Sequence, residues 1–121
     1  MYRKKTIVLV FIAAIVLAMN ACYYDKEQML YPVSFNCNGT APSFSTEVLP
    51  LITGSCSQGM GCHGAGSTNG PGALTTFNEI KNAGTQVLSS VKAGRMPLGS
   101  SLTAAQIKTI NCWVTNGMLN N

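Results

Sequence analysis

Apolar residues after position 40 recur at the spacing of helices and do not alternate with polar residues, so the pattern predicts helices and no strands. The clearest helix is expected at residues 103–118, where Thr103 and Gln106 can form a capping box at its start. Its apolar positions are Ile107, Ile110, Val114 and Gly117, with Trp113 beside them as a core residue.

Three shorter helices are expected, each followed by a glycine: residues 46–52 before Gly54, 76–83 before Gly84, and 86–93 before Gly94. Ser45 or Thr46 can cap the first of them, and Glu47 lies in its first turn, where the helix dipole favours an acidic side chain. The pattern as a whole predicts a small all-α domain of three to four short helices joined by large loops. Such a domain encloses little apolar volume, and a buried cofactor would supply part of its core.

The N-terminal residues have the features of an export signal. Residues 3–5 (Arg-Lys-Lys) precede an uncharged apolar run at residues 7–19, which is too short to span a bilayer. Ala21 followed by Cys22 resembles the cleavage site of bacterial lipoproteins, so we expect a lipoprotein signal peptide at residues 1–21 and a lipid anchor on Cys22. The alternative is an ordinary signal peptide cut nearby, which would leave Cys22 as a free thiol.

Residues 22–43 show no sustained period and are expected to form a tether, followed by a domain at residues 44–121. The whole chain has a net charge of +4, but without residues 3–5 it has five basic residues against four acidic ones. No basic patch remains that would favour nucleic acid as a partner. Tyr23, directly after Cys22, provides no inner-membrane retention signal, so we expect an outer-membrane lipoprotein on the periplasmic or cell-surface face.

The residues that carry chemistry are Cys56, Cys62 and His63, which is the sole histidine of the chain. A cysteine pair that ends in Cys-His is typical of covalent attachment of c-type haem, with two thioether bonds and an imidazole on the iron. Attachment motifs usually have two residues between the cysteines, whereas this one has five. On a regular helix the two thiols would point about 240° apart, so the segment has to loop out, which Gly59 and Gly61 permit.

A second iron ligand is expected from Met96, which lies in a later loop between Gly94 and Pro97. One covalent haem c ligated by His63 and Met96 would leave no open position on the iron, so it would transfer electrons and would not act as an enzyme. If Met96 did not bind the iron, the open position would be that of a sensor or a small haem peroxidase. The sequence has no residue set that favours hydrolysis, and too few ligands for a usual zinc site.

The pairing of the remaining cysteines depends on whether Cys56 and Cys62 hold haem. An exported protein is in an oxidising compartment, where idle thiols tend to pair. If Cys56 and Cys62 hold haem and Cys22 is lipidated, the pair left over is Cys37 and Cys112, and a bridge between them is expected to stabilise the domain by about 4–5 kcal/mol. The alternative is a disulfide between Cys56 and Cys62, which would make the protein a disulfide-stapled lipoprotein without cofactor, with a structural or binding role.

The order of these features over residues 44–120 resembles class I c-type cytochrome domains, and more narrowly the mono-haem cytochrome c lipoproteins of some Gram-negative bacteria. The motifs that carry the resemblance are Glu47-Val48-Leu49-Pro50, Gly94-Arg95-Met96-Pro97, and Asn111-Cys112-Trp113 with Asn116-Gly117, together with Cys-Tyr-Tyr-Asp-Lys-Glu from Cys22. The resemblance implies thioethers on Cys56 and Cys62, His63 as the proximal ligand and Met96 as the distal ligand. It also implies that the first and last helices cross and that the partners are redox proteins.

Overall fold

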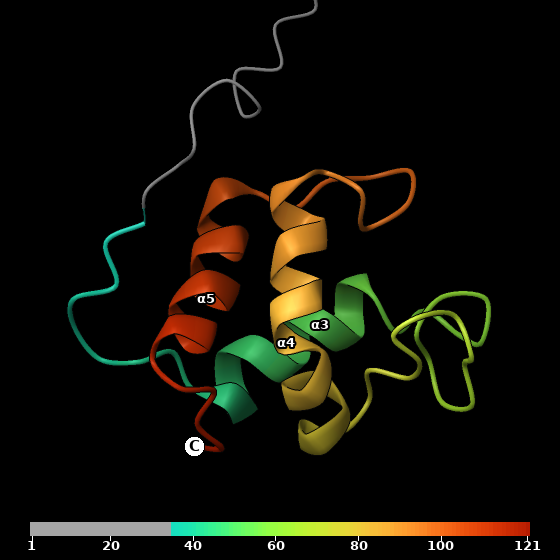
Figure 1. Ribbon diagram of the computed structural model, residues 1–121, viewed down its shortest axis with the longest axis horizontal. Coiled ribbons are helices and arrows are strands. Elements are labelled where there is room, and N and C mark those ends of the chain that lie inside the picture. The colour runs from blue at the N-terminus through green and yellow to red at the C-terminus, as the bar shows by residue number, and fades with distance from the viewer. Residues whose placement is uncertain (1–34) are drawn as a thin grey trace, which may run out of the picture. The chain divides into compact units, whose positions relative to one another are not determined.

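The computed structural model describes residues 35–121 of the chain (Figure 1). Its helices, in chain order, are the π-helical η2 (Phe44–Val48), α3 (Leu49–Ser55), α4 (Phe77–Lys92) and α5 (Ala104–Thr115). No strand occurs between residues 35 and 121, which confirms the all-α prediction for this part of the chain. The predicted signal peptide, the lipidation site Cys22 and the first part of the predicted tether lie outside the described residues.

The first predicted helix corresponds to η2 and α3, which follow each other without a break. It begins earlier than expected because Ser43 is the N-cap, and its side chain accepts a hydrogen bond from the Thr46 amide. The Glu47 carboxylate in turn accepts from the Ser43 amide at 2.8 Å. Gly54 does not end the helix as predicted, since α3 continues through it to the following residue.

Helix α4 is continuous, so the prediction of two helices separated at Gly84 is wrong. A buried stripe runs through the whole helix and consists of Ile80, Ala83, Gly84, Val87 and Val91. A Cβ atom at Gly84 would lie 2.7 Å from Met118 Sδ and 3.5 Å from the Trp113 ring. The glycine therefore permits close packing between α4 and the end of the chain, and it lies inside a continuous helix despite its low helix propensity. At the start of α4, Thr76 and Glu79 form a capping box.

Helix α5 begins as predicted, because Thr103 and Gln106 form the expected capping box. It ends at Thr115, three residues before the predicted end, and Met118 lies beyond it with a φ of 54°. Trp113 is only 1% exposed, which confirms that it is a core residue.

The core lies where η2, α4 and α5 meet. The Phe44 ring of η2 lies 5.6 Å from the Trp113 ring of α5 and 4.9 Å from the Phe77 ring of α4, measured between ring centroids. The last residue also holds the first helix, since Asn121 accepts hydrogen bonds from the Ser45 and Phe44 amides at 2.9 and 2.8 Å. The first and last helices are thus fixed to each other by both apolar and polar contacts.

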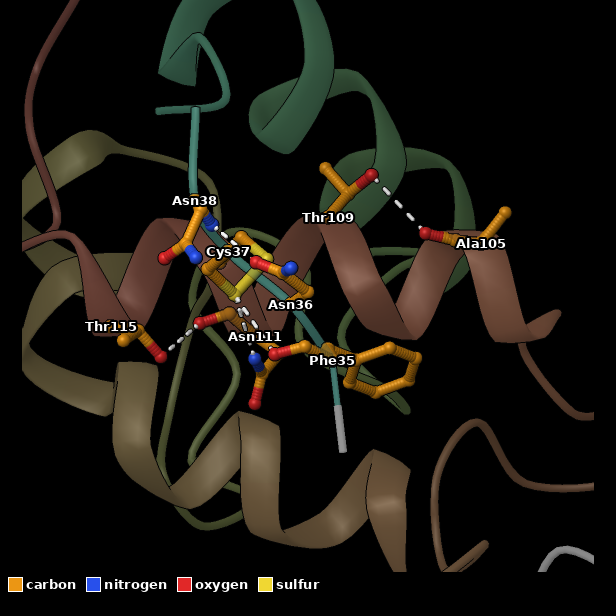
Figure 2. Close-up of a disulfide and its surroundings, with 9 residues drawn as sticks. Phe35, Asn36, Cys37, Asn38, Ala105, Thr109, Asn111 and Thr115 are labelled. Atoms are coloured by element: carbon orange, nitrogen blue, oxygen red, sulfur yellow. Dashed lines mark hydrogen bonds between the residues drawn. A yellow bond between two sulfur atoms is a disulfide. The ribbon is translucent and has the colours of Figure 1, made fainter. Parts of the chain in front are cut away.

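A disulfide between Cys37 and Cys112 attaches the segment before η2 to helix α5 (Figure 2). The Asn111 side-chain amide approaches the Cys37 sulfur at 3.2 Å, so it also contacts the bridge. Residues 35–43 therefore belong to the same folded unit as the helices, although they fall within the segment predicted as a tether. In Figure 1 they run along the outer side of α5, whereas the loop after α3 extends on the far side of α4.

Candidate functional site

A cavity of about 790 Å³ lies between the loop that follows α3 and the loop that joins α4 to α5. Its lining includes the four residues expected to carry chemistry, namely Cys56, Cys62, His63 and Met96. Residues from two distant parts of the sequence therefore face one space. The volume lies within the range of about 300–1,000 Å³ that is usual for ligand and cofactor pockets.

His63 is 7% exposed, and its ring is held in one orientation. Its Nδ1 lies 3.0 Å from the carbonyl oxygen of Gly72. Because a carbonyl can only accept a hydrogen bond, Nδ1 is the donor, and in the neutral ring Nε2 then has the lone pair that can bind a metal. The backbone is fixed too, since the His63 carbonyl accepts from the Leu74 amide at 2.8 Å.

The five residues between the cysteines form a closed loop and not a helix. The His63 amide donates to the Cys56 carbonyl at 3.0 Å, which joins the two ends of the loop. Inside the loop, the Gly59 carbonyl accepts from the amides of Cys62 and Gly64 at 3.1 and 2.9 Å. Gly59 has a φ of 109°, as the predicted loop requires. Gly61, also predicted to permit the loop, is not in the left-handed region.

Gly64 closes this loop, and no larger residue fits there. A Cβ atom at this position would lie 2.7 Å from the backbone carbon of Gly59. Real Cβ atoms do not come so close to backbone, so the loop would have to open to admit alanine. The loop shape therefore depends on a glycine that the sequence alone did not single out.

The two thiols of the motif differ in environment. Cys56 is buried, Cys62 is exposed, and neither forms a disulfide. Burial raises the pKa of the Cys56 thiol above its ordinary value, and the nearby Cys62 raises it further. Cys56 is therefore held in its protonated form at neutral pH.

Met96 is the methionine that faces the cavity. It is half-buried and also lines a smaller pocket of about 50 Å³, whose inner wall includes Leu74, Val87 and Val91. Met60 is 69% exposed and Met118 packs against the core, so neither of these methionines faces the cavity. An apolar wall from α4 thus lies behind the space that His63 and Met96 share.

Among residues 35–121, no charged residue lines the cavity. The nearest candidates in sequence point elsewhere: Arg95 donates to the Ser89 hydroxyl at 3.3 Å, and the Lys92 amine lies 5.9 Å from the Phe35 ring centroid. The polar side chains of the lining are neutral and include Gln58, Asn69, Ser100, Ser101 and Gln106. Within residues 35–121 there is also no cluster of three or more His, Cys, Asp or Glu side chains that could bind a metal ion.

Sequence reasoning missed the groups that position the motif. The groups concerned are the Gly72 carbonyl that holds His63 and the Ser67 and Asn69 side chains that contact the cysteine loop. They lie between the helices predicted at residues 46–52 and 76–83, outside any predicted element. A backbone carbonyl has no signature in a sequence, so its role could not have been foreseen. The serine and the asparagine carried a weak signal, because both are common in loops for reasons of turn geometry alone.

Among residues 35–121, no helix is both long enough and apolar enough to cross a bilayer. Comparisons of the chain with protein-family models, with curated proteins and with solved structures give no match. The function has to be inferred from the residues that line the cavity.

Proposed function

We propose that the protein is a mono-haem c-type cytochrome that carries electrons between redox proteins outside the cytoplasm. In this proposal Cys56 and Cys62 would form the thioether bonds, and His63 and Met96 would ligate the iron. Cys22 would carry the lipid that anchors the protein to the outer membrane.

The observation that carries the proposal is the composition of the cavity lining. The sole histidine, both unpaired cysteines of the motif and a methionine from a separate loop all face the same space of about 790 Å³. Most methionines in proteins serve packing or lie on the surface. It is the combination of these four residues, rather than any single one, that favours haem.

The residues present fit a haem group in chemistry as well as in position. The Gly72 carbonyl fixes the His63 ring and leaves Nε2 free as a ligand. Apolar side chains of α4 line the smaller pocket beside Met96, and Met96 offers a soft sulfur that favours reduced iron. Bound haem would supply a one-electron redox centre, and the chain would hold it, shield it and set its potential.

The order of elements supports a cytochrome c-like fold for the domain. The first helix is followed by the cysteine motif, then by α4, by the loop with Met96, and by a last helix that packs against the first. The resemblance to class I cytochromes implies this arrangement. The Cys37–Cys112 disulfide is compatible with the proposal, because it leaves Cys56 and Cys62 available.

The test is to express the full chain with haem-attachment machinery in a host that exports lipoproteins. We expect a band that stains for haem peroxidase activity after denaturing electrophoresis, and mass spectrometry should report one haem with two thioethers. A variant with Cys56→Ser and Cys62→Ser should give a colourless band. A colourless band from the wild-type chain, without a Soret absorption, would refute the proposal and favour a disulfide-stapled lipoprotein.

The sixth ligand is tested by two methionine substitutions. Met96→Ala should change the visible spectrum and lower the reduction potential, because a thioether ligand favours reduced iron. Met60→Ala is the matched control and should change neither, since its side chain is exposed and does not line the cavity. If Met96→Ala also left both unchanged, the assignment of Met96 would be wrong.

A further inference from the structure

We infer that Ser67 and Asn69 are positioning residues for covalent haem attachment, because they hold the lengthened cysteine loop in shape. The inference rests on the proposed function and extends it to residues outside the attachment motif. We call the Ser67 hydroxyl and the Asn69 side-chain amide together the carbonyl clamp.

The carbonyl clamp acts on consecutive carbonyl groups of the cysteine loop. The side-chain amide nitrogen of Asn69 lies 3.0 Å from the Gly61 carbonyl oxygen and 3.4 Å from the carbonyl oxygens of Met60 and Cys62. The Ser67 hydroxyl donates to the Cys62 oxygen at 2.5 Å. In a helix these carbonyls would have backbone partners, but the loop has none to offer them, so the clamp satisfies them instead.

The clamp is itself fixed to the backbone. The Ser67 backbone amide donates to the Gly64 carbonyl at 3.0 Å, and the Asn69 backbone amide donates to the Ser67 hydroxyl at 3.3 Å. Ser67 is buried, so its hydrogen bond to the loop is shielded from water. The clamp residues are therefore held by hydrogen bonds to their own segment as well as to the loop.

The same segment orients both the thiol and the imidazole. Cys62 is held through its own carbonyl by the clamp, and the neighbouring His63 is held through its ring by Gly72, a few residues after Asn69. A thioether forms when the S–H of a cysteine adds across a vinyl C=C, so a new C–S bond forms, the hydrogen goes to the other carbon, and no electrons are gained or lost. This addition requires the thiol to be presented to a fixed point, which a mobile loop would do rarely.

The two cysteines do not depend equally on the clamp. Cys56 directly follows α3, and its amide donates to the Ile52 carbonyl at 2.8 Å, so the helix positions it. Cys62 is at the far end of the loop. Loss of the clamp should therefore impair attachment at Cys62 and spare attachment at Cys56.

The experiment compares the full chain, matured with haem-attachment machinery, with variants of the clamp. Asn69→Asp keeps the shape of the side chain and removes the donating amide, and Ser67→Ala removes the hydroxyl. Asn69→Gln keeps an amide donor and serves as the rescue variant. Thr68→Ala is the matched control, because Thr68 is exposed between the two clamp residues and its side chain makes no hydrogen bond with residues 35–121.

The readout is the ratio of doubly to singly attached protein, measured by mass spectrometry, with the free thiol located by alkylation after denaturation. We expect this ratio to fall about fivefold for each hydrogen bond lost, which corresponds to about 1 kcal/mol. The free thiol should be at Cys62, and Thr68→Ala and Asn69→Gln should behave like the wild type. Asn69→Asp changes an exposed residue, so it tests the inference even if Ser67→Ala does not fold.

Two results would overturn the inference, and they differ in what else they refute. If the wild type and Asn69→Asp both carry two thioethers in equal yield, the clamp has no positioning role, while the proposed function stands. The same holds if the free thiol in the variants is at Cys56. If the wild-type chain carries no haem at all, the proposed function fails and the inference fails with it.

Discussion

Removal of the Cys37–Cys112 disulfide should cost the domain a large part of its stability. The perturbation is the double substitution Cys37→Ala and Cys112→Ala. The two residues are 75 positions apart in the sequence, so the bridge closes a loop that includes almost the whole folded unit. The chain-entropy model gives about 4–5 kcal/mol for a loop of this length.

That magnitude is large compared with the stability to be expected of the domain. Small domains have about 0.05–0.15 kcal/mol of net stability per residue, which for residues 35–121 is about 4–13 kcal/mol. The loss therefore amounts to a third or more of the total. The Asn111 amide adds to it, because its contact with the Cys37 sulfur disappears in a mostly buried position.

The assay is the unfolding of wild type and variant in urea, followed by far-ultraviolet circular dichroism. Asn38→Ala is the control, because this exposed residue adjoins Cys37 and carries no bridge. The midpoint should fall and the denaturant slope should rise, since the unfolded chain without its crosslink exposes more surface. The wild type under a reductant should behave like the double variant. If the double variant and the reduced wild type each lost less than about 1 kcal/mol of unfolding free energy, the entropic account of this bridge would be wrong.

Four further predictions concern the loops, the helices and the two thiols of the motif. Gly64→Ala should destabilise the protein by about 1–3 kcal/mol, because its Cβ would meet the Gly59 backbone at 2.7 Å. Gly84→Ala should change stability by less than about 1 kcal/mol, because the flexible Met118 side chain can move away and alanine favours the helix. Urea unfolding of the two glycine variants measures these two stability changes, and equal losses of stability would contradict this reasoning. Hydrogen bonds from the Thr75 amide, the Thr75 hydroxyl and the Thr76 amide hold the pKa of Glu79 below its ordinary value of 4.5. Its contribution to stability is therefore complete above that value and is lost as the pH falls through the lower folded-state pKa. Thermal unfolding of Glu79→Gln from about pH 6 to 3 should show a smaller acid-dependent loss than the wild type, and parallel curves would disprove the role of this carboxylate. In protein made without haem-attachment machinery, iodoacetamide should alkylate the exposed Cys62 well before Cys56, whose burial keeps its pKa high. Peptide mapping over time measures the order of alkylation, and equal rates at the two cysteines would refute this prediction.

The parts of the fold that local chemistry determines could be predicted from the sequence. Thr103 and Gln106 form their capping box within one turn of helix, so the start of α5 needs no information from the rest of the chain. Gly84 shows the opposite case. Its propensity predicts a helix end, but Gly84 lies inside α4 and closely approaches Met118 and Trp113, and only the folded structure reveals that contact.

The candidate site likewise has residues that the sequence predicts and groups that only the structure reveals. Cys56, Cys62, His63 and Met96 were identified by residue type and spacing, and the structure places all four around one cavity. The groups that orient them are mostly backbone carbonyls, such as that of Gly72, together with side chains in a loop. Neither periodicity nor composition encodes such partners, because every residue carries a carbonyl and only the path of the chain decides which one is near.

The distribution of contacts explains how a small domain can keep such a cavity open. Apolar packing is concentrated where η2, α4 and α5 meet, and the disulfide and the Asn121 hydrogen bonds reinforce that same region. The loops around the cavity are instead held by hydrogen bonds to their own carbonyls. Polar contacts fix a backbone without filling the space beside it, whereas apolar packing would close that space. The cavity can thus keep its shape because most of the residues that bound it lie outside the core, with Cys56 and Leu102 as the residues shared by both.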